Sequence, residues 1–190
     1  MFLPVSYHPG YVIPLPPRYR FPMEKFDMVY QFLQTNGYPG QVRFFRPDFP
    51  PEEWCRDVHT ENYLKQLNEG TLEPKALRRI ALPWSPELIR RTKIAVGGSI
   101  LTARLALKYG LACNTAGGTH HAFPDYGAGY CVLNDLSITA RVVQGTERVH
   151  RVLIIDLDVH QGDGTAAIFQ SDPSVFTFSM HCKENFPYRK

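Results

Sequence analysis

The sequence lacks closely paired cysteines, and this absence argues against the usual cysteine-rich scaffolds. Its four cysteines are widely spaced and form no C-x-x-C pair; they are Cys55, Cys113, Cys131 and Cys182. This spacing favours free thiols in a reducing compartment over a disulfide framework or a four-cysteine zinc site. We therefore expect a cytoplasmic protein.

Long apolar runs and dense blocks of positive charge are missing as well. No stretch approaches the ~20 apolar residues that a membrane span needs, and prolines interrupt the N-terminal residues where a secretory signal would need an apolar core. The formal net charge is only +3, and it is spread along the chain rather than gathered in a Lys/Arg block. We expect neither a membrane nor a nucleic acid as a direct partner.

What the sequence does contain fits one soluble domain. The chain has 190 residues, of which 44% are hydrophobic and 21% charged, enough to build a core. Residues 1–22 are rich in proline and aromatic residues. They could form a polyproline ligand for a partner, but we favour a surface loop that leads into the domain, because a helical pattern begins directly afterwards.

The hydrophobic periodicity predicts helices in the first part of the chain and an α/β alternation in the second. Helices are expected over 23–37, 60–70, 85–110 and 134–143 and from about 165, and strands over 42–45, 111–116, 151–159 and 175–181. Thr60 and Ser85 are the expected N-caps, and Gly37, Gly70 and Gly110 the expected stops. The pattern predicts an α/β fold with three layers (αβα) and a mostly parallel sheet.

Residues 151–159, "RVLIIDLDV", are apolar on both faces, as a strand buried in the middle of a parallel sheet must be. The run leads into "DLDVHQGDG", which places carboxylates and an imidazole at the strand exit, where ligands bind in such sheets. If the extended geometry continues, Asp156, Asp158 and His160 share one face. Burying such polar and charged side chains is costly unless hydrogen bonds or an opposite charge compensate. A divalent metal, zinc or a similar ion, would supply that charge and suits this mixture of donors.

The same residues have a plainer explanation, in which the aspartates cap the following helix and the histidine packs in its loop. A second polar cluster, His120-His121 in the loop "GGTHHAFPDYGAGYC", favours the metal. Adjacent side chains point in different directions, so both histidines binding one ion is awkward. We therefore interpret His120 and His121 as catalytic and the "DLDVH" residues as the ligands.

Taken together, "GGTHHAFPDYGAGYCVLND", "VLIIDLDVHQGDG" and "FSMHCKENFP" resemble the zinc-dependent histone deacetylase family. That family includes bacterial acetylpolyamine amidohydrolases and has an arginase-like α/β fold. The resemblance extends from about "PRYRFPM" to the last residue. It implies hydrolysis of acetyl or other acyl groups from lysine side chains of proteins, or from acetylated polyamines.

The resemblance assigns roles residue by residue. The implied metal ligands are Asp158 and His160, which would hold Zn²⁺ or, in its place, Fe²⁺. The implied catalytic residues are His120, His121, Asp156 and Asp163, with Asp156 bonded to His120 and Asp163 bonded to His121. His121 is the expected general base, and His120 is an electrostatic or acid partner.

The resemblance also implies contacts to substrate and to a second ion. Gly129 matches a glycine that contacts substrate, and Tyr130 and Phe186 match the aromatic walls of an acyl-lysine tunnel. A structural K⁺ site is implied at Asp156, Asp158, His160, Ser179 and Met180. Arg20 is matched to an arginine behind the active site.

Two groups that the family uses are not found here: a third metal-binding Asp and a catalytic Tyr, both expected downstream. Residues 1–190 are therefore expected to form a single incomplete histone-deacetylase-like domain, apparently truncated, with little activity alone. The alternatives are a shortened, inactive homologue that binds a metal or acyl-lysine, and a two-metal ureohydrolase-like enzyme. The sequence sets no oligomeric state.

Overall fold

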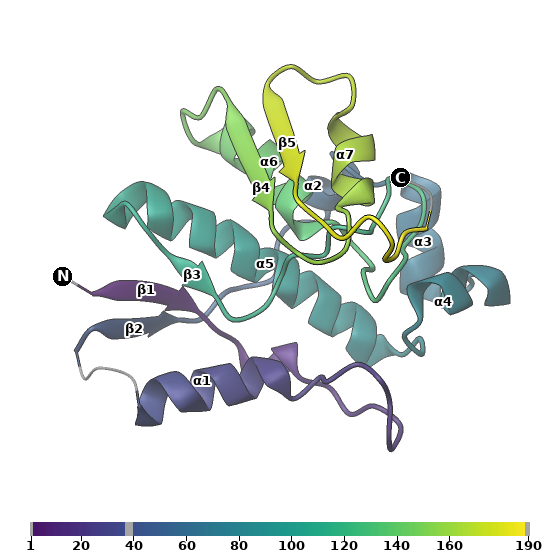
Figure 1. Cartoon of the computed structure of the whole chain (residues 1–190), viewed down its shortest axis with the longest axis horizontal. Coiled ribbons are helices and arrows are strands. Elements are labelled where there is room, and N and C mark those ends of the chain that lie inside the picture. Colours follow the sequence, from purple (N-terminus) through teal and green to yellow (C-terminus); the bar gives the residue numbers. More distant parts are fainter. Residues whose placement is uncertain (1, 37–39, 189–190) are drawn as a thin grey trace.

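The computed structural model describes residues 2–36 and 40–188, which fold into helices and parallel strands (Figure 1). The elements are β1 (Leu3–Ser6), η1 (Pro9–Tyr11), α1 (Lys25–Thr35), β2 (Val42–Phe45), α2 (Glu52–Arg56), α3 (Glu61–Glu69), α4 (Pro74–Ile80), α5 (Pro86–Tyr109), β3 (Cys113–Asn114), α6 (Asp135–Thr146), β4 (Val152–Asp156), α7 (Asp163–Phe169) and β5 (Val175–Ser179). The predicted three-layer α/β fold with a mostly parallel sheet is confirmed.

The helix ends follow the expected capping chemistry. The side chains of Thr60 and Ser85 accept the backbone N–H of the third residue of α3 and α5, respectively. Gly70 and Gly110 close the same two helices in the left-handed conformation. α1 ends at Thr35, and the stop expected at Gly37 lies outside the described residues.

The prediction of a loop over residues 1–22 is wrong for its first part. Residues Leu3–Ser6 form β1, the middle strand of the sheet β2-β1-β3, and both Val5 and Ser6 are buried. The sequence pattern does not predict this strand, because it is only four residues long and contains Pro4, a residue that is unusual in a central strand. Short helices α2 and α4 were missed for a related reason, since neither is long enough to show a period.

Helix α5 forms the centre of the molecule. It packs against β1, β3 and α6, and Figure 1 shows α1 on the opposite side of the three-stranded sheet. A Cβ atom on Gly97 would overlap the carbonyl of Asp48, and one on Gly98 would overlap the hydroxyl of Tyr11. The glycine pair therefore permits the close approach of α5 to Asp48 and Tyr11.

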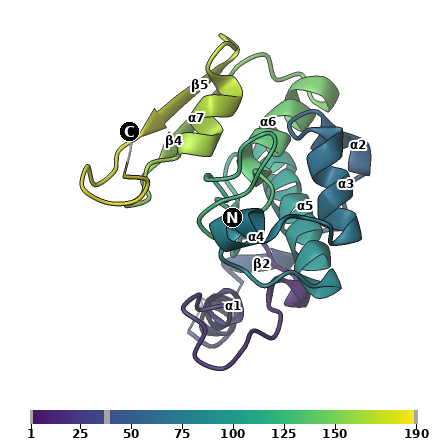
Figure 2. The ribbon, with the colours of Figure 1, turned by 90° about the vertical axis from the view of Figure 1, so that its right-hand side faces the viewer.

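Strands β4 and β5 form a separate two-stranded parallel sheet within the described residues (Figure 2). Ile154, Val175, Phe169 and Ala140 form a small core cluster between these strands and helices α6 and α7. The sheet is thereby held to the rest of the molecule through one face.

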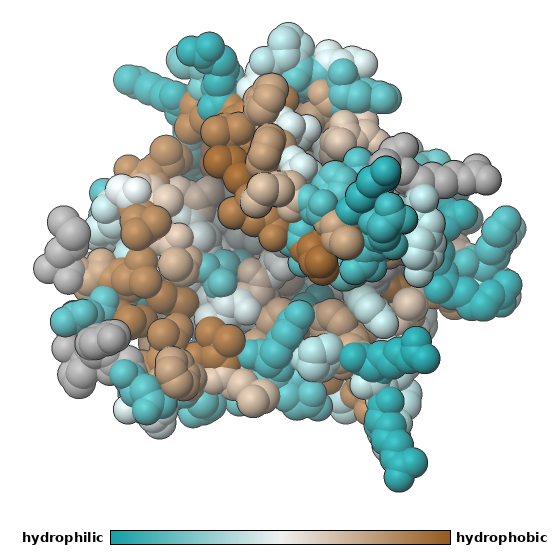
Figure 3. Space-filling view, viewed as in Figure 1, coloured by the Kyte–Doolittle hydropathy of each residue, from teal (hydrophilic) through white to brown (hydrophobic). Residues whose placement is uncertain are grey.

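The expectation that both faces of this sheet are buried is wrong. Leu153 and Ile155 of β4 are 59% and 57% exposed, while Ile154 between them is 8% exposed. Phe176 and Phe178 of β5 are exposed on the same side. Figure 3 shows the resulting apolar surface over β4 and β5. The apolar residues are those of a doubly covered parallel strand, but the described residues cover only one face.

This arrangement predicts opposite effects for neighbouring residues. Leu153→Ser should leave the free energy of unfolding within about 0.5 kcal/mol of the parent, because the side chain is already in water. Ile154→Ser should cost about 2–5 kcal/mol, because it empties the cluster beneath the sheet. Urea unfolding measures both values, and equal losses would contradict the exposed face. Leu153→Ser should also weaken binding of an apolar dye.

The four cysteines are all free, as expected. Burial raises the pKa of the Cys55 thiol to about 11 and that of Cys131 to about 12, so neither forms a thiolate near neutral pH. Of the helices in the described ranges, none combines the length and the apolar composition needed to cross a bilayer.

Candidate active site

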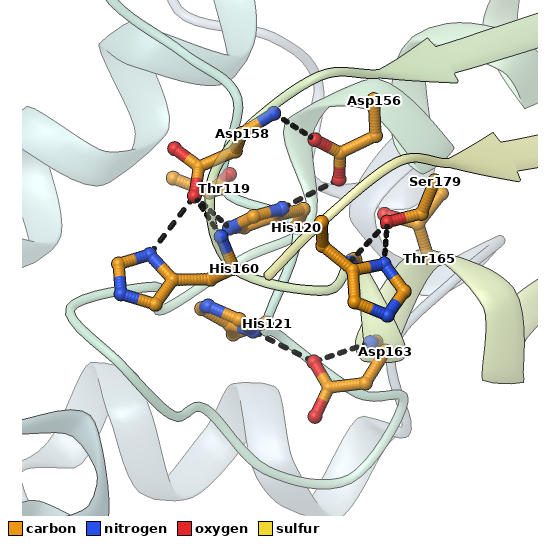
Figure 4. A network of polar contacts seen from close by, with 12 residues as sticks. Thr119, His120, His121, Asp156, Asp158, His160, Asp163, Thr165 and Ser179 are labelled. Carbon is orange, nitrogen blue, oxygen red and sulfur yellow. Dashed lines mark hydrogen bonds and ion pairs between the residues drawn. The ribbon is translucent and has the colours of Figure 1, made fainter. Parts of the chain in front are cut away.

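The chain leaves β4 at Asp156 and turns at once. The Asp156 carboxylate accepts the backbone N–H of Asp158 at 3.0 Å, and the Asp158 carboxylate accepts that of His160 at 2.7 Å. These side-chain bonds replace ladder bonds, so the strand expected over 151–159 ends at Asp156, and the extended geometry does not continue to His160. The turns nevertheless keep all three side chains in one loop, beside the histidine pair (Figure 4).

Two histidine–aspartate pairs lie next to this loop. The Nδ1 atom of His120 is 2.6 Å from Oδ2 of Asp156, and the Nδ1 atom of His121 is 2.7 Å from Oδ1 of Asp163. Both histidines are buried, and their ring centroids lie 4.0 Å apart. Each carboxylate is an acceptor, so each Nδ1 carries the proton of this hydrogen bond and each Nε2 points away from its aspartate partner.

The two partners of each pair come from distant parts of the chain and are held close by backbone contacts. The N–H of Thr165 in α7 donates to the carbonyl of His120 at 3.1 Å. A Cβ atom on Gly162 would overlap the Asp156 carboxylate. The glycine in "HQGDG" thus allows the loop after β4 to pass against the His120–Asp156 pair.

The residues expected to bind metal lie together and hydrogen-bond to each other. The Nδ1 atom of His160 is 2.9 Å from Oδ1 of Asp158, and Nε2 of His120 is 4.0 Å from the same oxygen. Partial burial acts to raise the pKa of Asp158, but hydrogen bonds from His160 and the charges of His120 and His160 outweigh it and hold that pKa below its ordinary value.

This donor set fits part of a zinc site. One imidazole and one carboxylate are ordinary zinc ligands, and a catalytic zinc takes three protein ligands. Among residues 2–36 and 40–188, no group of three or more His, Cys, Asp or Glu side chains is arranged to hold an ion. Metal binding by Asp158 and His160 stays a prediction, and the described part of the chain places no third ligand beside them.

Two of the three residues expected to contact substrate lie beside His121. The Phe186 ring meets the His121 ring edge to face, with centroids 4.8 Å apart. Gly129 has φ +53°, and a Cβ atom there would lie 2.7 Å from Cδ2 of His121 and 3.1 Å from Cε1 of Phe186. Tyr130 also has a positive φ, and its ring lies against Phe21. Gly129 and Phe186 thus border His121 directly, whereas Tyr130 lies on the side of Phe21.

Gly129→Ala should therefore cost more stability than a positive φ alone explains. Gly110→Ala is the matched control, because Gly110 has φ +88° but faces open space. We expect about 1 kcal/mol for the control and about 1–3 kcal/mol more for Gly129→Ala, which must displace a ring. Urea unfolding of both variants gives the difference in the free energy of unfolding. Equal losses of stability would contradict the prediction, because they would show that the His121 ring moves aside at no cost.

The residues expected at a structural cation site meet where β4 and β5 end. Asp156 is paired with Ser179 in the sheet register, and the N–H of Met180 donates to the Asp156 carbonyl at 3.0 Å. Cation binding there stays a prediction. Arg20, expected behind the active site, is exposed, and the buried arginine of the described residues is Arg91 in α5.

Several residues that contact the site have no role that the sequence pattern alone predicts. His181 shares a hydrogen bond with Ser179 at 2.9 Å. Asn134 and Asp135 are buried and bond to the loop that carries the histidine pair. A buried Asn-Asp pair directly after an apolar "CVL" was the available signal, because polar residues in such a position need partners.

Comparison with known proteins places the chain in a family. The sequence matches the model of the histone deacetylase domain over residues 19–190. It is 56% identical over 190 residues to an uncharacterised protein of Picosynechococcus sp., with 100% of this chain and 63% of that protein covered. It is 30% identical over 174 residues to histone deacetylase 2 of Arabidopsis thaliana, which covers 88% of this chain and 45% of the relative.

A third relative is histone deacetylase 8 of Xenopus tropicalis, 32% identical over 165 residues, with 82% of this chain and 44% of the relative covered. The chain thus spans between about half and two thirds of the length of these relatives. The domain match covers most of the chain and includes both histidine–aspartate pairs. The chain belongs to the histone deacetylase family, whose members are hydrolases.

Proposed function

We propose that this chain supplies part of a metal-dependent amide hydrolase that removes acetyl or other acyl groups from lysine side chains or from acetylated polyamines. The observation that carries the proposal is the convergence of two His–Asp pairs, each with a buried histidine, on Asp158 and His160. The family is generally zinc-dependent, which supports Zn²⁺, or Fe²⁺ in its place, as the ion.

The chain's own residues divide the chemistry between them. Asp158 and His160 would hold the ion, which supplies a polarised carbonyl and a more acidic bound water. His121 takes up a proton at Nε2 and returns it to the leaving amine, while Asp163 fixes its Nδ1–H. His120, held by Asp156, stabilises negative charge that develops beside it.

The surroundings of His121 favour an acylated chain over a free ammonium. Phe186 offers an apolar ring against which the methylenes of an acyl-lysine can pack, and Tyr130 is proposed as the second wall. The glycine at 129 brings the backbone close to His121. This chemistry is shared by protein lysines and polyamines, with no direct role for nucleic acid or membrane. The free thiols support a cytoplasmic location.

We further propose that residues 1–190 are one incomplete domain, and that a third metal-binding Asp and a catalytic Tyr come from polypeptide outside it. The two-ligand set and the coverage of 63%, 45% and 44% of three relatives support this. Intact mass of the protein as its own cells produce it tests the proposal. A mass well above 21.7 kDa agrees with it, and a mass of 21.7 kDa with full activity would overturn it.

Zinc content and acetyl-lysine hydrolysis, measured on that same cellular protein, test the function. One ion per chain with turnover is the expected result. The two-ligand set favours one rival, a module that binds acyl-lysine without hydrolysing it. Ligand binding without turnover would establish this rival, and two ions per chain would point instead to a ureohydrolase-like enzyme.

A further inference from the structure

Two adjacent residues at the start of α6, Asn134 and Asp135, are the most deeply buried polar pair near the site. They are 0% and 1% exposed, respectively. Neither belongs to the proposed catalytic set. Burying a carboxylate is costly unless hydrogen bonds replace its water, so the partners of Asp135 show what the burial achieves.

All of the hydrogen bonds that the Asp135 carboxylate accepts come from outside its own helix. Oδ1 accepts the N–H of Thr119 at 2.7 Å and the Thr119 hydroxyl, and Oδ2 accepts the N–H of Gly118 at 3.1 Å and the hydroxyl of Ser99. The backbone N–H of Asp135 in turn donates to the Thr119 hydroxyl at 3.1 Å. Asp135 therefore ties down the two residues that directly precede His120.

Asn134 holds the other end of the histidine pair. Its Nδ2 donates to the carbonyl of Ala122, the residue after His121, at 3.0 Å, and to the hydroxyl of Thr165 at 3.1 Å. Its Oδ1 accepts the N–H of Ser137 at 3.0 Å and caps α6. The capping of α6 is thus complete without Asp135, and a purely helical role does not account for the buried carboxylate.

Asp135 also contributes a buried negative charge beside a buried positive one. Burial lowers the pKa of the Arg91 guanidinium, and the charge of Asp135 acts in the opposite direction. Arg91 donates to the Tyr11 carbonyl at 3.1 Å, which fixes it in α5. The Asp135 carboxylate is therefore held against α5 by the Ser99 hydrogen bond and by the charge of Arg91. Through its bonds to Gly118 and Thr119, it fixes the backbone before His120 relative to α5.

We propose that Asn134 and Asp135 are positioning residues, which hold the backbone on both sides of His120-His121 so that each Nδ1 meets its aspartate. The hydrogen bonds to Gly118, Thr119 and Ala122 hold the backbone on both sides of His120-His121. The His120 carbonyl is fixed separately by the N–H of Thr165. Catalytic side chains need placement within about 0.5 Å, which two bracketed residues achieve and a free loop does not. The importance of this positioning rests on the proposed function, but the positioning itself does not.

Proton NMR of the protein as its own cells produce it, freed of metal and substrate, tests the positioning. The Nδ1–H protons of His120 and His121 point at carboxylates and should resonate far downfield. Asp135→Asn keeps the shape and removes the charge. It should abolish the His120 resonance and speed hydrogen exchange of the Gly118 and Thr119 amides by about tenfold or more.

Val142→Ala is the matched control, because Val142 is buried in the same helix and does not contact the loop through hydrogen bonds. It should lower the melting temperature and keep both downfield resonances. Retention of the His120 resonance in folded Asp135→Asn would overturn the proposal. Should that variant fail to fold, Thr119→Val removes the hydroxyl that bonds to both the carboxylate and the backbone N–H of Asp135, and it should weaken the resonance. An unchanged resonance there overturns the proposal equally.

These outcomes are separable from the fate of the proposed function. If the downfield resonances are present and Asp135→Asn abolishes that of His120, but the protein binds no zinc and hydrolyses nothing, the positioning role stands. The proposed deacetylase function is then refuted. If the protein binds zinc and turns over substrate, but its downfield resonances are unchanged by Asp135→Asn, the proposed deacetylase function stands and the positioning role is refuted.

Discussion

His121→Gln in the protein as its own cells produce it should lower acetyl-lysine hydrolysis by about 10²- to 10⁴-fold, the usual contribution of a general acid–base. Glutamine keeps a donor that can reach Asp163, now 2.7 Å from His121, but it cannot take up and return a proton. The loss should appear in kcat rather than in KM, because the proton moves only during the reaction. Steady-state kinetics on an acetyl-lysine substrate measures both.

Two further variants separate the proton transfer from a general loss of structure. Asp163→Asn should also lower kcat, because an amide no longer requires the tautomer with its proton on Nδ1. His150→Gln makes the same chemical change at an exposed histidine and should leave kcat unchanged. A His121→Gln enzyme with at least a tenth of the parent rate would exclude His121 as the general base.

The parts of the fold that the sequence predicts are those fixed by local chemistry. Thr60 and Gly70 bound a helix because a hydroxyl accepts an N–H and a glycine adopts a positive φ, and neither effect needs distant residues. The same holds for Ser85 at the start of α5. The contacts between His120 and Asp156 were anticipated only through the family resemblance, since they join residues 36 apart.

The features that the sequence does not predict depend on the tertiary structure. β1 becomes a central strand because β2 and β3 pair with both its edges, and nothing in "LPVS" indicates those partners. The end of β4 is a local exception: Asp156 ends the strand because its side chain accepts an N–H two residues ahead, whereas the apolar pattern alone predicts a longer strand. Asp135 likewise accepts hydrogen bonds from Ser99 in α5 and from Thr119, directly before His120. These contacts join distant parts of the chain and exist only in the folded protein.

His59 should make the stability of the chain depend on pH between about 4 and 6.5. Its Nδ1 lies 3.0 Å from the Phe123 carbonyl and its Nε2 accepts the N–H of Asn134 at 2.9 Å, an arrangement that only the neutral ring satisfies. Burial lowers the pKa of His59 to about 4, despite carbonyl contacts from Phe123 and Pro124 that act to raise it. The Tyr63 ring, whose centroid lies 5.8 Å from that of His59, is uncharged because burial raises the pKa of its hydroxyl.

Because the folded pKa lies below the ordinary value of 6.5, the unfolded chain binds a proton first as the pH falls. The contribution of His59 is therefore fully present above pH 6.5 and is lost on the way to pH 4, by about 3 kcal/mol in total. Urea unfolding at pH 7 and pH 5 should show about 2 kcal/mol of that loss. His59→Gln provides the matched control, because an amide offers one donor and one acceptor and does not titrate. If the parent and His59→Gln lose the same stability between these pH values, the neutral His59 bridge between the histidine loop and α6 is not what makes the fold sensitive to acid.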